Sequence, residues 1–466
     1  MGIKQKLALY RDLKSGVKHC TFNPRGPGVV RIHLVPPRFR LFGASSYIVI
    51  LNGYYLLPLG YSWALLLSAF IEEVYRFEGK PINDEVLTEI ADRTVLRVHR
   101  IFRSVSRPLL AEDLDAMLDV LFEIATGGDT EAEIEKLSIR TYGKRMQAPH
   151  RMDLMVRAMN DECGAWQCNQ KCLFCYAAGQ SYAKTRELST EEWKTAIDKL
   201  RAAGVPMLTF TGGEPTQRAD LPALVEHAKW FVTRLNTNGI LLTDALANAL
   251  RTAELDSVQI TLYSSDAAVH NELVGAEHFH DTVRGIEAAV RAGLDVSVNT
   301  PLCRQNSDYL STLRLLSSLG VRFVTVSGLI CTGTAAVNHD RYDLSADELF
   351  DIVSNAKQFC NENGMEIDFT SPGLIAAERL EAIGMNVPMC GAALSNMAVA
   401  PDGTVLPCQS WLSSDAALGN ILTDPFKAIW KHKKCIALRN MGAAEALSCP
   451  FRTANGKEEQ HGKREK

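Results

Sequence analysis

The residues best suited to chemistry are three cysteines close together in the chain. Cys168, Cys172 and Cys175 lie in the segment QCNQKCLFCYA, with the spacing C-x3-C-x2-C. Three thiolates on one short loop can hold three irons of a cubane iron–sulfur cluster. The fourth iron then has no protein ligand and can bind a substrate or a cofactor, as in catalytic metal sites that keep one position open.

A second group of cysteines lies near the end of the chain and comprises Cys390, Cys408, Cys435 and Cys449. The pair Asp402-Gly403, between the first two of them, is a strong signal for a β-hairpin. We expect this hairpin to fold residues 397–400 back on residues 404–406 and to bring Cys390 close to Cys408. Two further cysteines, Cys303 and Cys331, each follow a predicted strand and are candidates for facing a site, although most free cysteines are small buried hydrophobic residues.

The composition describes a soluble globular protein. The chain has 466 residues, 46% of them hydrophobic, and its 50 Lys and Arg against 54 Asp and Glu give a net charge of −4. A near-neutral balance argues against binding nucleic acid through bulk charge. Because the first residues lack the features of a secretory signal, we expect a cytoplasmic protein, in which clustered cysteines are metal ligands or catalytic groups rather than disulfides.

One apolar stretch, YIVILNGYYLLPLGYSWALLLSAFI, is long enough to span a membrane. Asn52-Gly53, Pro58 and Gly60 interrupt it, however, and the Asn-Gly pair is typical of a hairpin turn between two short strands. We therefore predict a hairpin followed by a buried helix over residues 61–75, with a membrane span as the alternative.

From about Asp153 onward, short apolar strands alternate with helices, which is typical of an α/β fold with a parallel sheet. We predict strands near residues 155–159, 207–210, 231–235, 257–262, 294–299 and 322–327. Six such units fit an open or partial (β/α)6 TIM barrel. In such folds the chemistry lies at the carboxyl ends of the strands, where the cysteine triplet and several polar segments are found.

The chain divides by pattern into four parts. Residues 1–150 form an N-terminal α+β domain, and residues 151–371 form the barrel. Residues 372–452 lose the alternation, hold the second cysteine group and form a small iron–sulfur domain. Residues 453–466 are charged and predicted to be disordered.

The triplet, with Phe174 before its last cysteine, resembles the signature of radical S-adenosylmethionine (SAM) enzymes. A second motif, TGGEP at residues 211–215, follows the next strand and resembles the family segment whose backbone and carboxylate contact the methionine amino group of SAM. The segments NTNG at residues 236–239, QITLYSSDAAVH at 259–270 and VNTPLCRQN at 298–306 resemble further strand ends of this family. The cofactor-binding residues implied by the resemblance are Phe174, Gly212, Gly213, Glu214, Thr261 and Asn299. For Thr261 and Asn299 the alternative is an ordinary helix-capping role.

The resemblance implies a mechanism and partners. A [4Fe-4S] cluster on Cys168, Cys172 and Cys175 cleaves SAM reductively, giving methionine and a 5′-deoxyadenosyl radical that abstracts hydrogen from an unactivated carbon. A flavodoxin- or ferredoxin-type protein is the implied electron donor.

The second cysteine group resembles the SPASM and twitch extensions of radical SAM enzymes. Full SPASM domains have a denser run of cysteines for two auxiliary clusters, so we predict one auxiliary [4Fe-4S] cluster, held by Cys390, Cys408, Cys435 and Cys449. Two clusters per chain follow, with a tetrahedral zinc site as the alternative for the second.

Enzymes of this type often act on ribosomally synthesised precursor peptides. The N-terminal domain loosely resembles the PqqD-like winged-helix element that pairs an edge strand with a leader peptide, a common recognition mode. We therefore predict a peptide maturase that forms a crosslink or related change. The alternatives are an enzyme acting on a small molecule such as a tetrapyrrole or another cofactor precursor, and a non-catalytic iron–sulfur carrier or peptide-binding scaffold.

Overall fold

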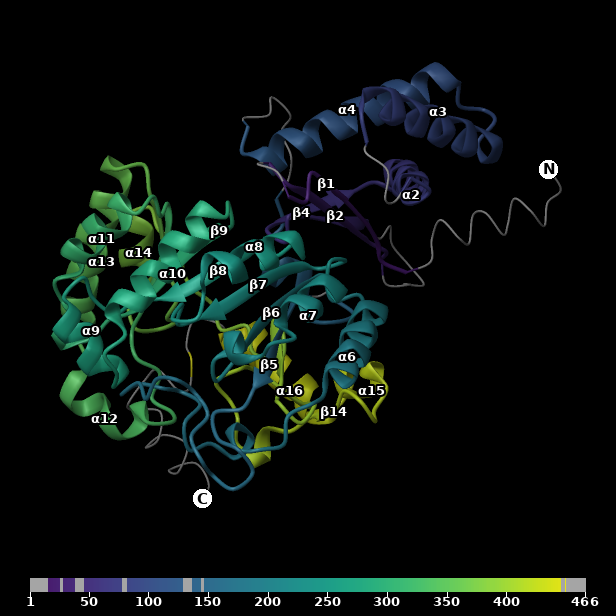
Figure 1. Ribbon diagram of the computed structural model, residues 1–466. Helices are drawn as coiled ribbons and strands as arrows, with labels where there is room; N and C mark the ends of the chain where they lie inside the picture. Colours follow the sequence, from purple (N-terminus) through teal and green to yellow (C-terminus); the bar gives the residue numbers. More distant parts are fainter. Residues whose placement is uncertain are drawn as a thin grey trace. The chain divides into compact units, whose positions relative to one another are not determined.

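The computed structural model describes residues 16–25, 28–37, 46–77, 82–128, 136–143, 146–445 and 449. Within these ranges the chain forms two compact units (Figure 1). The N-terminal unit consists mainly of residues before Pro149, and the barrel unit consists mainly of residues after it. The tail at 453–466, which was predicted to be disordered, lies outside the described residues.

The N-terminal unit contains a four-stranded antiparallel sheet. Its strands lie in the order β1 (Lys18–Phe22), β2 (Val30–Val35), β3 (Tyr47–Leu51) and β4 (Tyr55–Leu59). Between β3 and β4, Asn52 and Gly53 have φ angles of 50° and 70°, the left-handed conformation that Asn and Gly adopt most readily. The Asn-Gly hairpin predicted from the sequence is therefore confirmed.

Helices complete the N-terminal unit: α2 (Tyr61–Tyr75), α3 (Asp84–Ile101), α4 (Arg107–Thr126) and α5 (Ile139–Gly143). The predicted buried helix is α2, whose side chains from Ala64 to Ile71 are all buried. These side chains join a core with residues of the sheet and of α3 and α4. The apolar stretch is thus accounted for by a strand pair and a core helix. Among the described residues, no helix has both the length and the apolar character needed to cross a bilayer.

The barrel unit is built on one sheet of ten strands in the order β11-β10-β9-β8-β7-β6-β5-β12-β13-β14. The strands from β5 to β11 follow one another in the chain. The pairs β5–β6, β7–β8, β8–β9, β9–β10 and β10–β11 are all parallel. Their bounds are β5 (Arg151–Arg157), β6 (Met207–Gly212), β7 (Val232–Thr237), β8 (Ser257–Thr261), β9 (Asp295–Pro301), β10 (Phe323–Ser327) and β11 (Glu366–Phe369).

The six predicted barrel strands are thus confirmed, with β5 beginning four residues before its predicted start. The structure adds β11 as a seventh strand, parallel to β10. With four residues, of which Glu366 and Asp368 are exposed, β11 lacks the apolar run that marks the other strands. Its alternation of exposed and buried residues is nevertheless that of an edge strand.

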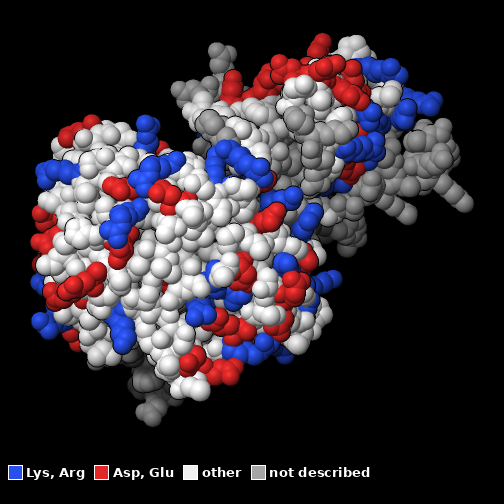
Figure 2. All heavy atoms as spheres, viewed as in Figure 1, with Lys and Arg blue, Asp and Glu red and all other residues white. Residues whose placement is uncertain are grey.

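Helices flank the strands of the barrel unit (Figure 1). The α-helices are α6 (Thr190–Ala203), α7 (Leu221–His227), α8 (Asp244–Thr252), α9 (Ala267–Val274), α10 (Phe279–Arg291), α11 (Tyr309–Ser318), α12 (Ala335–Tyr342), α13 (Ala346–Glu362), α14 (Ala377–Ala382), α15 (Phe426–Trp430) and α16 (Lys433–Glu445). Short 3-10 turns are η1 (Ser181–Ala183), η2 (Pro215–Gln217), η3 (Arg304–Asn306) and η4 (Ser414–Ala416). On the face drawn in Figure 2, basic and acidic side chains are interspersed over the barrel unit, in keeping with the near-neutral composition of the whole chain.

The last three strands of this sheet come from the cysteine-containing C-terminal part. They are β12 (Asn396–Val399), β13 (Thr404–Leu406) and β14 (Gly419–Asn420). β12 and β13 form the predicted Asp402-Gly403 hairpin, in which Gly403 has a φ of 88°. Because β12 also pairs with β5 in parallel, the C-terminal part continues the barrel's own sheet. This pairing brings the second cysteine group to the strand that leads into the first.

Candidate active site

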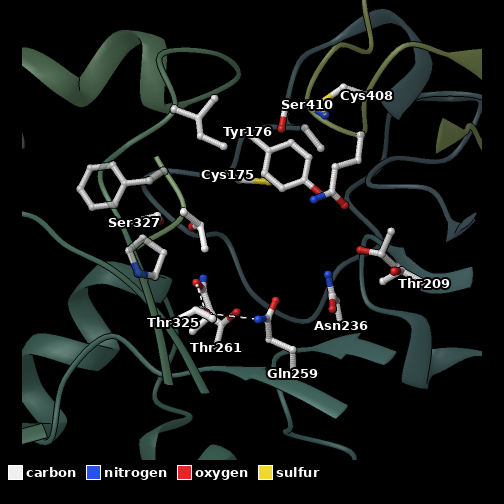
Figure 3. A pocket seen from close by; sticks show the side chains of 18 of the residues that line it. Cys175, Tyr176, Thr209, Asn236, Gln259, Thr261, Thr325, Ser327, Cys408 and Ser410 are labelled. Atoms are coloured by element: carbon white, nitrogen blue, oxygen red, sulfur yellow. Dashed lines mark hydrogen bonds between the residues drawn. The ribbon is translucent and has the colours of Figure 1, made fainter. Parts of the chain in front are cut away.

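A cavity of ≈ 590 Å³ lies in the barrel unit. Its walls come from the strand ends of the sheet, from the loop that carries the cysteine triplet and from the segment around the second cysteine group (Figure 3). The predicted site residues that line it are Cys168, Cys172, Phe174, Cys175, Gly212, Gly213, Glu214, Thr261, Asn299, Cys390, Cys408 and Cys449. The cavity therefore unites both cysteine groups, which are more than 200 positions apart in the chain.

We call residues 167–178 the cluster loop. Backbone hydrogen bonds anchor it to helix α9, from Lys171 N to Val274 O (3.0 Å) and from Leu173 N to Leu273 O (2.9 Å). On its other side, Thr334 N donates to Cys175 O (3.0 Å). These contacts hold three thiols on one wall of the cavity, as a three-cysteine iron site requires.

Burial dominates the electrostatics of these thiols. Loss of solvation raises the pKa of Cys168 to about 12, and it raises the pKa of Cys172 well above its ordinary value, with the neighbouring thiols adding to the rise. The pKa of Cys175 is raised by the same burial. Three half-buried cysteines whose thiolates repel one another are stabilised by a shared cation, so this donor set fits an iron–sulfur cluster.

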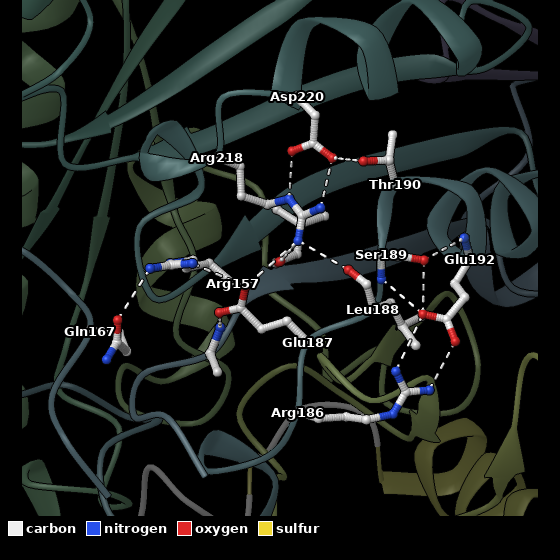
Figure 4. A network of polar contacts seen from close by, with 12 residues as sticks. Arg157, Gln167, Arg186, Glu187, Leu188, Ser189, Thr190, Glu192, Arg218 and Asp220 are labelled. Atoms are coloured by element: carbon white, nitrogen blue, oxygen red, sulfur yellow. Dashed lines mark hydrogen bonds and ion pairs between the residues drawn. The ribbon is translucent and has the colours of Figure 1, made fainter. Parts of the chain in front are cut away.

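A polar network braces the entry to the cluster loop (Figure 4). Arg157 donates to Glu187 Oε2 (3.1 Å) and to Gln167 Oε1 (3.2 Å), and Gln167 directly precedes the first cysteine. Glu187 Oε1 in turn accepts from the backbone of Ala158 (2.9 Å). Nearby, Arg218 forms a bidentate pair with Asp220 and donates to two backbone carbonyls. The network fixes the end of β5, from which the loop departs.

The loop after β6 carries the two adjacent glycines. Gly212 has a φ of 136°, and a Cβ atom there would lie 2.3 Å from Arg157 O. A Cβ on Gly213 would lie 2.7 Å from Ala158 O, and Gly213 N donates to Arg157 O at 2.8 Å. Only glycine permits this approach of two backbones. The approach places the next residue, Glu214, in the cavity wall.

Glu214 is 1% exposed and receives four hydrogen bonds. Its Oε1 accepts from Thr216 N (3.0 Å), Thr216 Oγ1 (2.5 Å) and Thr237 Oγ1 (2.6 Å), and its Oε2 accepts from Asn238 N (2.9 Å). Burial raises the pKa of this carboxyl group, and the hydrogen bonds oppose the rise by stabilising the anion. A buried carboxylate with fixed orientation is suited to holding an ammonium group, such as the one on the methionine part of SAM.

The remaining predicted cofactor contacts also line the cavity. Phe174 packs against the rings of Tyr263 and Tyr342, with centroids at 6.4 and 5.2 Å. On the opposite wall, Asn299 Oδ1 accepts from Thr325 Oγ1 (2.9 Å), whose oxygen also accepts from Gln259 (3.2 Å) (Figure 3). Strands β8, β9 and β10 thus present a linked polar surface toward the cysteines.

In the second cysteine group, Cys390, Cys408 and Cys449 line the cavity. The Cys390 thiol is hydrogen-bonded to that of Cys449, and this contact together with burial raises the pKa of Cys390. Burial raises the pKa of Cys408, and the neighbouring Cys449 thiol adds to the rise.

The structure does not bring Cys435 to the cavity lining. Its side chain is fully buried on α16, and its sulfur accepts a 3.1 Å hydrogen bond from Arg439, one turn later on the same helix. Arg439 also donates to Ala393 O (2.9 Å) and stacks on Trp430, with its guanidinium carbon 3.3 Å from the ring centroid. Cys303 and Cys331 likewise do not line the cavity; Cys303 is buried and Cys331 is half-buried.

Sequence reasoning missed several polar residues of the cavity. Tyr176 extends between Cys175 and Cys408 (Figure 3), and burial raises the pKa of its hydroxyl. Thr209 and Asn236 line the wall, and Thr209 Oγ1 and Asn236 Oδ1 have no hydrogen-bond partner among the described residues. The period-two pattern of the strands, which turns alternate residues inward, could have indicated Thr209 and Asn236.

Comparisons with known proteins agree with this geometry. Residues 167–316 match the radical SAM superfamily, and residues 390–450 match the SPASM iron–sulfur cluster-binding domain. The chain is 29% identical to an AdoMet-dependent heme synthase from Oleidesulfovibrio alaskensis, over 57% of this chain and 74% of that protein. It is 28% identical to the mycofactocin maturase MftC of Mycolicibacterium smegmatis, over 58% of this chain and 70% of that one.

Among solved structures, the crystal structure of Streptococcus suis SuiB bound to precursor peptide SuiA matches with a TM-score of 0.57. It covers 84% of this chain and 87% of SuiB at 13% identity, which establishes a shared fold. Taken with the two cysteine groups of the cavity, the two domain matches show that the chain contains a radical SAM domain followed by a SPASM domain and is a radical SAM enzyme, with SAM and iron–sulfur clusters as its cofactors.

Proposed function

We propose that this enzyme modifies a ribosomally synthesised precursor peptide by hydrogen abstraction, forming a crosslink or a related change. The observation that carries the proposal is that the triplet thiols, Glu214 and three thiols of the second cysteine group line the same cavity. A site that faces two iron–sulfur centres suits an oxidative change of a substrate, because one centre can initiate the reaction and the other can accept an electron.

In this proposal the chain's residues position and shield the reactants. When bound, SAM and a reduced cluster on Cys168, Cys172 and Cys175 supply a 5′-deoxyadenosyl radical, which takes a hydrogen atom from the substrate. Glu214 holds the ammonium group of SAM, and the polar surface of β8 to β10, including Asn299 and Thr261, contacts the rest of the cofactor. Buried side chains in the lining, such as Phe174 and Tyr263, exclude water from part of the cavity.

Two observations favour a peptide as the substrate. The relative MftC is named as a maturase, and the SuiB structure contains a precursor peptide. In the N-terminal unit, β1 (Lys18–Phe22) is the outer strand on one side of the described sheet. An outer strand can pair with an extended leader peptide through main-chain hydrogen bonds. We propose that β1 has this role, in a cytoplasmic enzyme that receives electrons from a flavodoxin- or ferredoxin-type donor.

A second candidate substrate is a tetrapyrrole. The heme synthase relative, at 29% identity over 289 residues, favours it as directly as MftC favours the peptide. The two candidates differ in what binds the N-terminal unit, because a tetrapyrrole has no backbone to pair with β1.

The test uses the full chain, reconstituted with iron and sulfide without oxygen and supplied with SAM and a strong reductant. We expect release of 5′-deoxyadenosine that is lost in a Cys168/Cys172/Cys175 triple alanine variant. Co-expression with each short peptide encoded by a reading frame next to the enzyme's gene should then change the mass of one of them, in the wild type alone. If every peptide is unchanged and an added porphyrin is converted, the substrate is a tetrapyrrole and not a peptide. Absence of 5′-deoxyadenosine would refute both.

A further inference from the structure

We propose that Cys331, His339 and Asp343 form a zinc site outside the active-site cavity. One donor atom from each of the three side chains lies within 4.8 Å of the other two. None of the three lines the cavity that holds the two cysteine groups. The site is therefore distinct from the iron–sulfur centres described above.

The local structure explains why the three residues meet. Cys331 follows β10, in the connection that leads to α12 (Ala335–Tyr342). His339 lies on α12 and Asp343 is its C-terminal cap, so the spacing of four residues places both side chains on one face of the helix. The connection returns Cys331 to that same face. Two ligands from one helical turn and a third from a preceding loop make a compact site.

The donor set suits zinc better than magnesium or calcium. A thiolate, an imidazole and a carboxylate are the three side-chain ligand types that zinc accepts, whereas magnesium and calcium prefer oxygen donors alone. Zinc–sulfur and zinc–nitrogen bonds of about 2.3 and 2.0 Å allow a sulfur–nitrogen separation of at most about 4.3 Å. The three donors, which lie within 4.8 Å of one another, must therefore move closer together to bind one ion, and the fourth position is left to water.

The exposure of the site is compatible with loading from solution. The side chains of His339 and Asp343 are 18% and 36% exposed. His339 Nδ1 lies 3.3 Å from Asp343 Oδ2 and 3.2 Å from Asp340 Oδ1, so an ordinary ion pair of a protonated imidazole is the competing explanation. An ion pair needs no thiol, whereas the proposed zinc site does. A test of Cys331 therefore distinguishes the two explanations.

A zinc ion here would fix both ends of the segment that supports the cluster loop. Within the segment, Thr334 Oγ1 lies 3.3 Å from Cys172 O, and Asn338 Nδ2 donates to Leu173 O (2.8 Å). A Cβ on Gly333 would lie 2.2 Å from Cys175 O, which shows how closely the two backbones pack. The proposed site thus ties α12 to the connection that holds the triplet in place.

The test measures zinc and iron per chain by mass spectrometry of the elements, in full-length protein purified without oxygen from zinc-supplemented cells. We compare the wild type with His339→Ala and Cys331→Ser, and with His280→Ala as the control, because His280 is an exposed histidine on α10. We expect about one zinc per chain more in the wild type and in H280A than in H339A and C331S, with equal iron in all four.

Two results would overturn the proposal. Equal zinc in the wild type and H339A would leave only the ion pair. Loss of zinc in H339A but not in C331S would show that the thiol is no ligand, which contradicts the three-residue site. If H339A does not fold, Asp343→Asn replaces it, because that variant removes a ligand charge and keeps the shape of the side chain.

Discussion

Thr237 Oγ1 donates a 2.6 Å hydrogen bond to Oε1 of Glu214, so the end of strand β7 holds the carboxylate that the loop after β6 presents. Thr237 also accepts a hydrogen bond from Gly239 N (3.0 Å), which fixes its hydroxyl. The donor is thus oriented before any ligand binds. Two neighbouring parallel strands place these groups side by side, because their carboxyl ends meet at one edge of the sheet.

We expect Glu214→Gln to weaken SAM binding by roughly 10- to 100-fold, the effect of losing a charge-assisted hydrogen bond of about 1.5–3 kcal/mol. The amide keeps the size of the side chain but removes the charge that attracts the ammonium group. Equilibrium binding of SAM to the reconstituted enzyme measures the change. Glu226→Gln, on an exposed position of α7, is the control and should bind SAM as the wild type does. Equal affinity of both variants would contradict the role given to Glu214.

We expect Gly212→Ala to destabilise the protein by roughly 2 kcal/mol or more, because the new methyl group meets the backbone of Arg157 and the φ of 136° is unfavourable for alanine. Gly293→Ala separates these two causes. Gly293 also has a positive φ, of 71°, but a Cβ there has open space around it. It should lose only about 1 kcal/mol from backbone strain. Denaturant unfolding of both variants measures the difference, and equal losses would show that the close approach is unimportant.

The sequence predicted the barrel strands well because each is an apolar run flanked by helices, and local pattern is sufficient for such elements. It missed β11, since a strand of four residues at the edge of a sheet has too few apolar positions to be recognised. It also did not predict that β12 pairs with β5. That pairing joins residues more than 200 positions apart, and no local pattern records it.

The site shows the same difference between features that a local pattern predicts and features that depend on the folded chain. The triplet and the glycines before Glu214 could be identified because each motif is contiguous and each residue type is needed for a physical reason. The cavity residue Tyr176 was missed, because a single polar side chain on a loop looks the same whether it faces solvent or a cavity. Only the folded chain shows which way it points.

We expect protonation of His270 to destabilise the protein below about pH 6.5. His270 is fully buried on α9, and its Nδ1 lies 3.3 Å from Tyr263 N, as an acceptor. Burial lowers its pKa from 6.5 to about 4. Between these values the unfolded chain binds more protons than the native one, so stability is present above pH 6.5 and is lost as the pH falls.

From these pKa values, the loss attributable to His270 between pH 7.5 and 5.5 is about 1 kcal/mol. His270→Asn retains a hydrogen-bond acceptor but does not titrate, so its unfolding free energy should fall less over this interval. Denaturant unfolding at both pH values, followed by tryptophan fluorescence, gives the comparison. His280→Ala is the matched control and should retain the wild-type dependence. A wild-type dependence in H270N as well would mean that another group is responsible.

We expect Cys435→Ser to keep the auxiliary cluster and Cys408→Ser to lose it. The resemblance to SPASM and twitch extensions, with few cysteines left in this part of the chain, led us to predict Cys435 as a ligand, but a resemblance does not show which face of α16 turns toward the cavity. In the structure the Cys435 sulfur accepts from Arg439, which also binds the carbonyl of Ala393 in the segment after Cys390. Cys435 then positions Arg439, and serine can accept the same hydrogen bond.

Iron and acid-labile sulfide per chain after reconstitution measure the outcome. With one cluster at each cysteine group, the wild type should hold about eight irons, C435S about eight and C408S about four. The Cys168/Cys172/Cys175 triple alanine variant should retain only the auxiliary cluster, and it serves as the reference for about four irons per chain. If C435S also falls to about four while its thermal unfolding is unchanged, Cys435 is the fourth ligand. The segment around α16 must then rearrange when the cluster binds, because the buried Cys435 does not line the cavity in the present geometry.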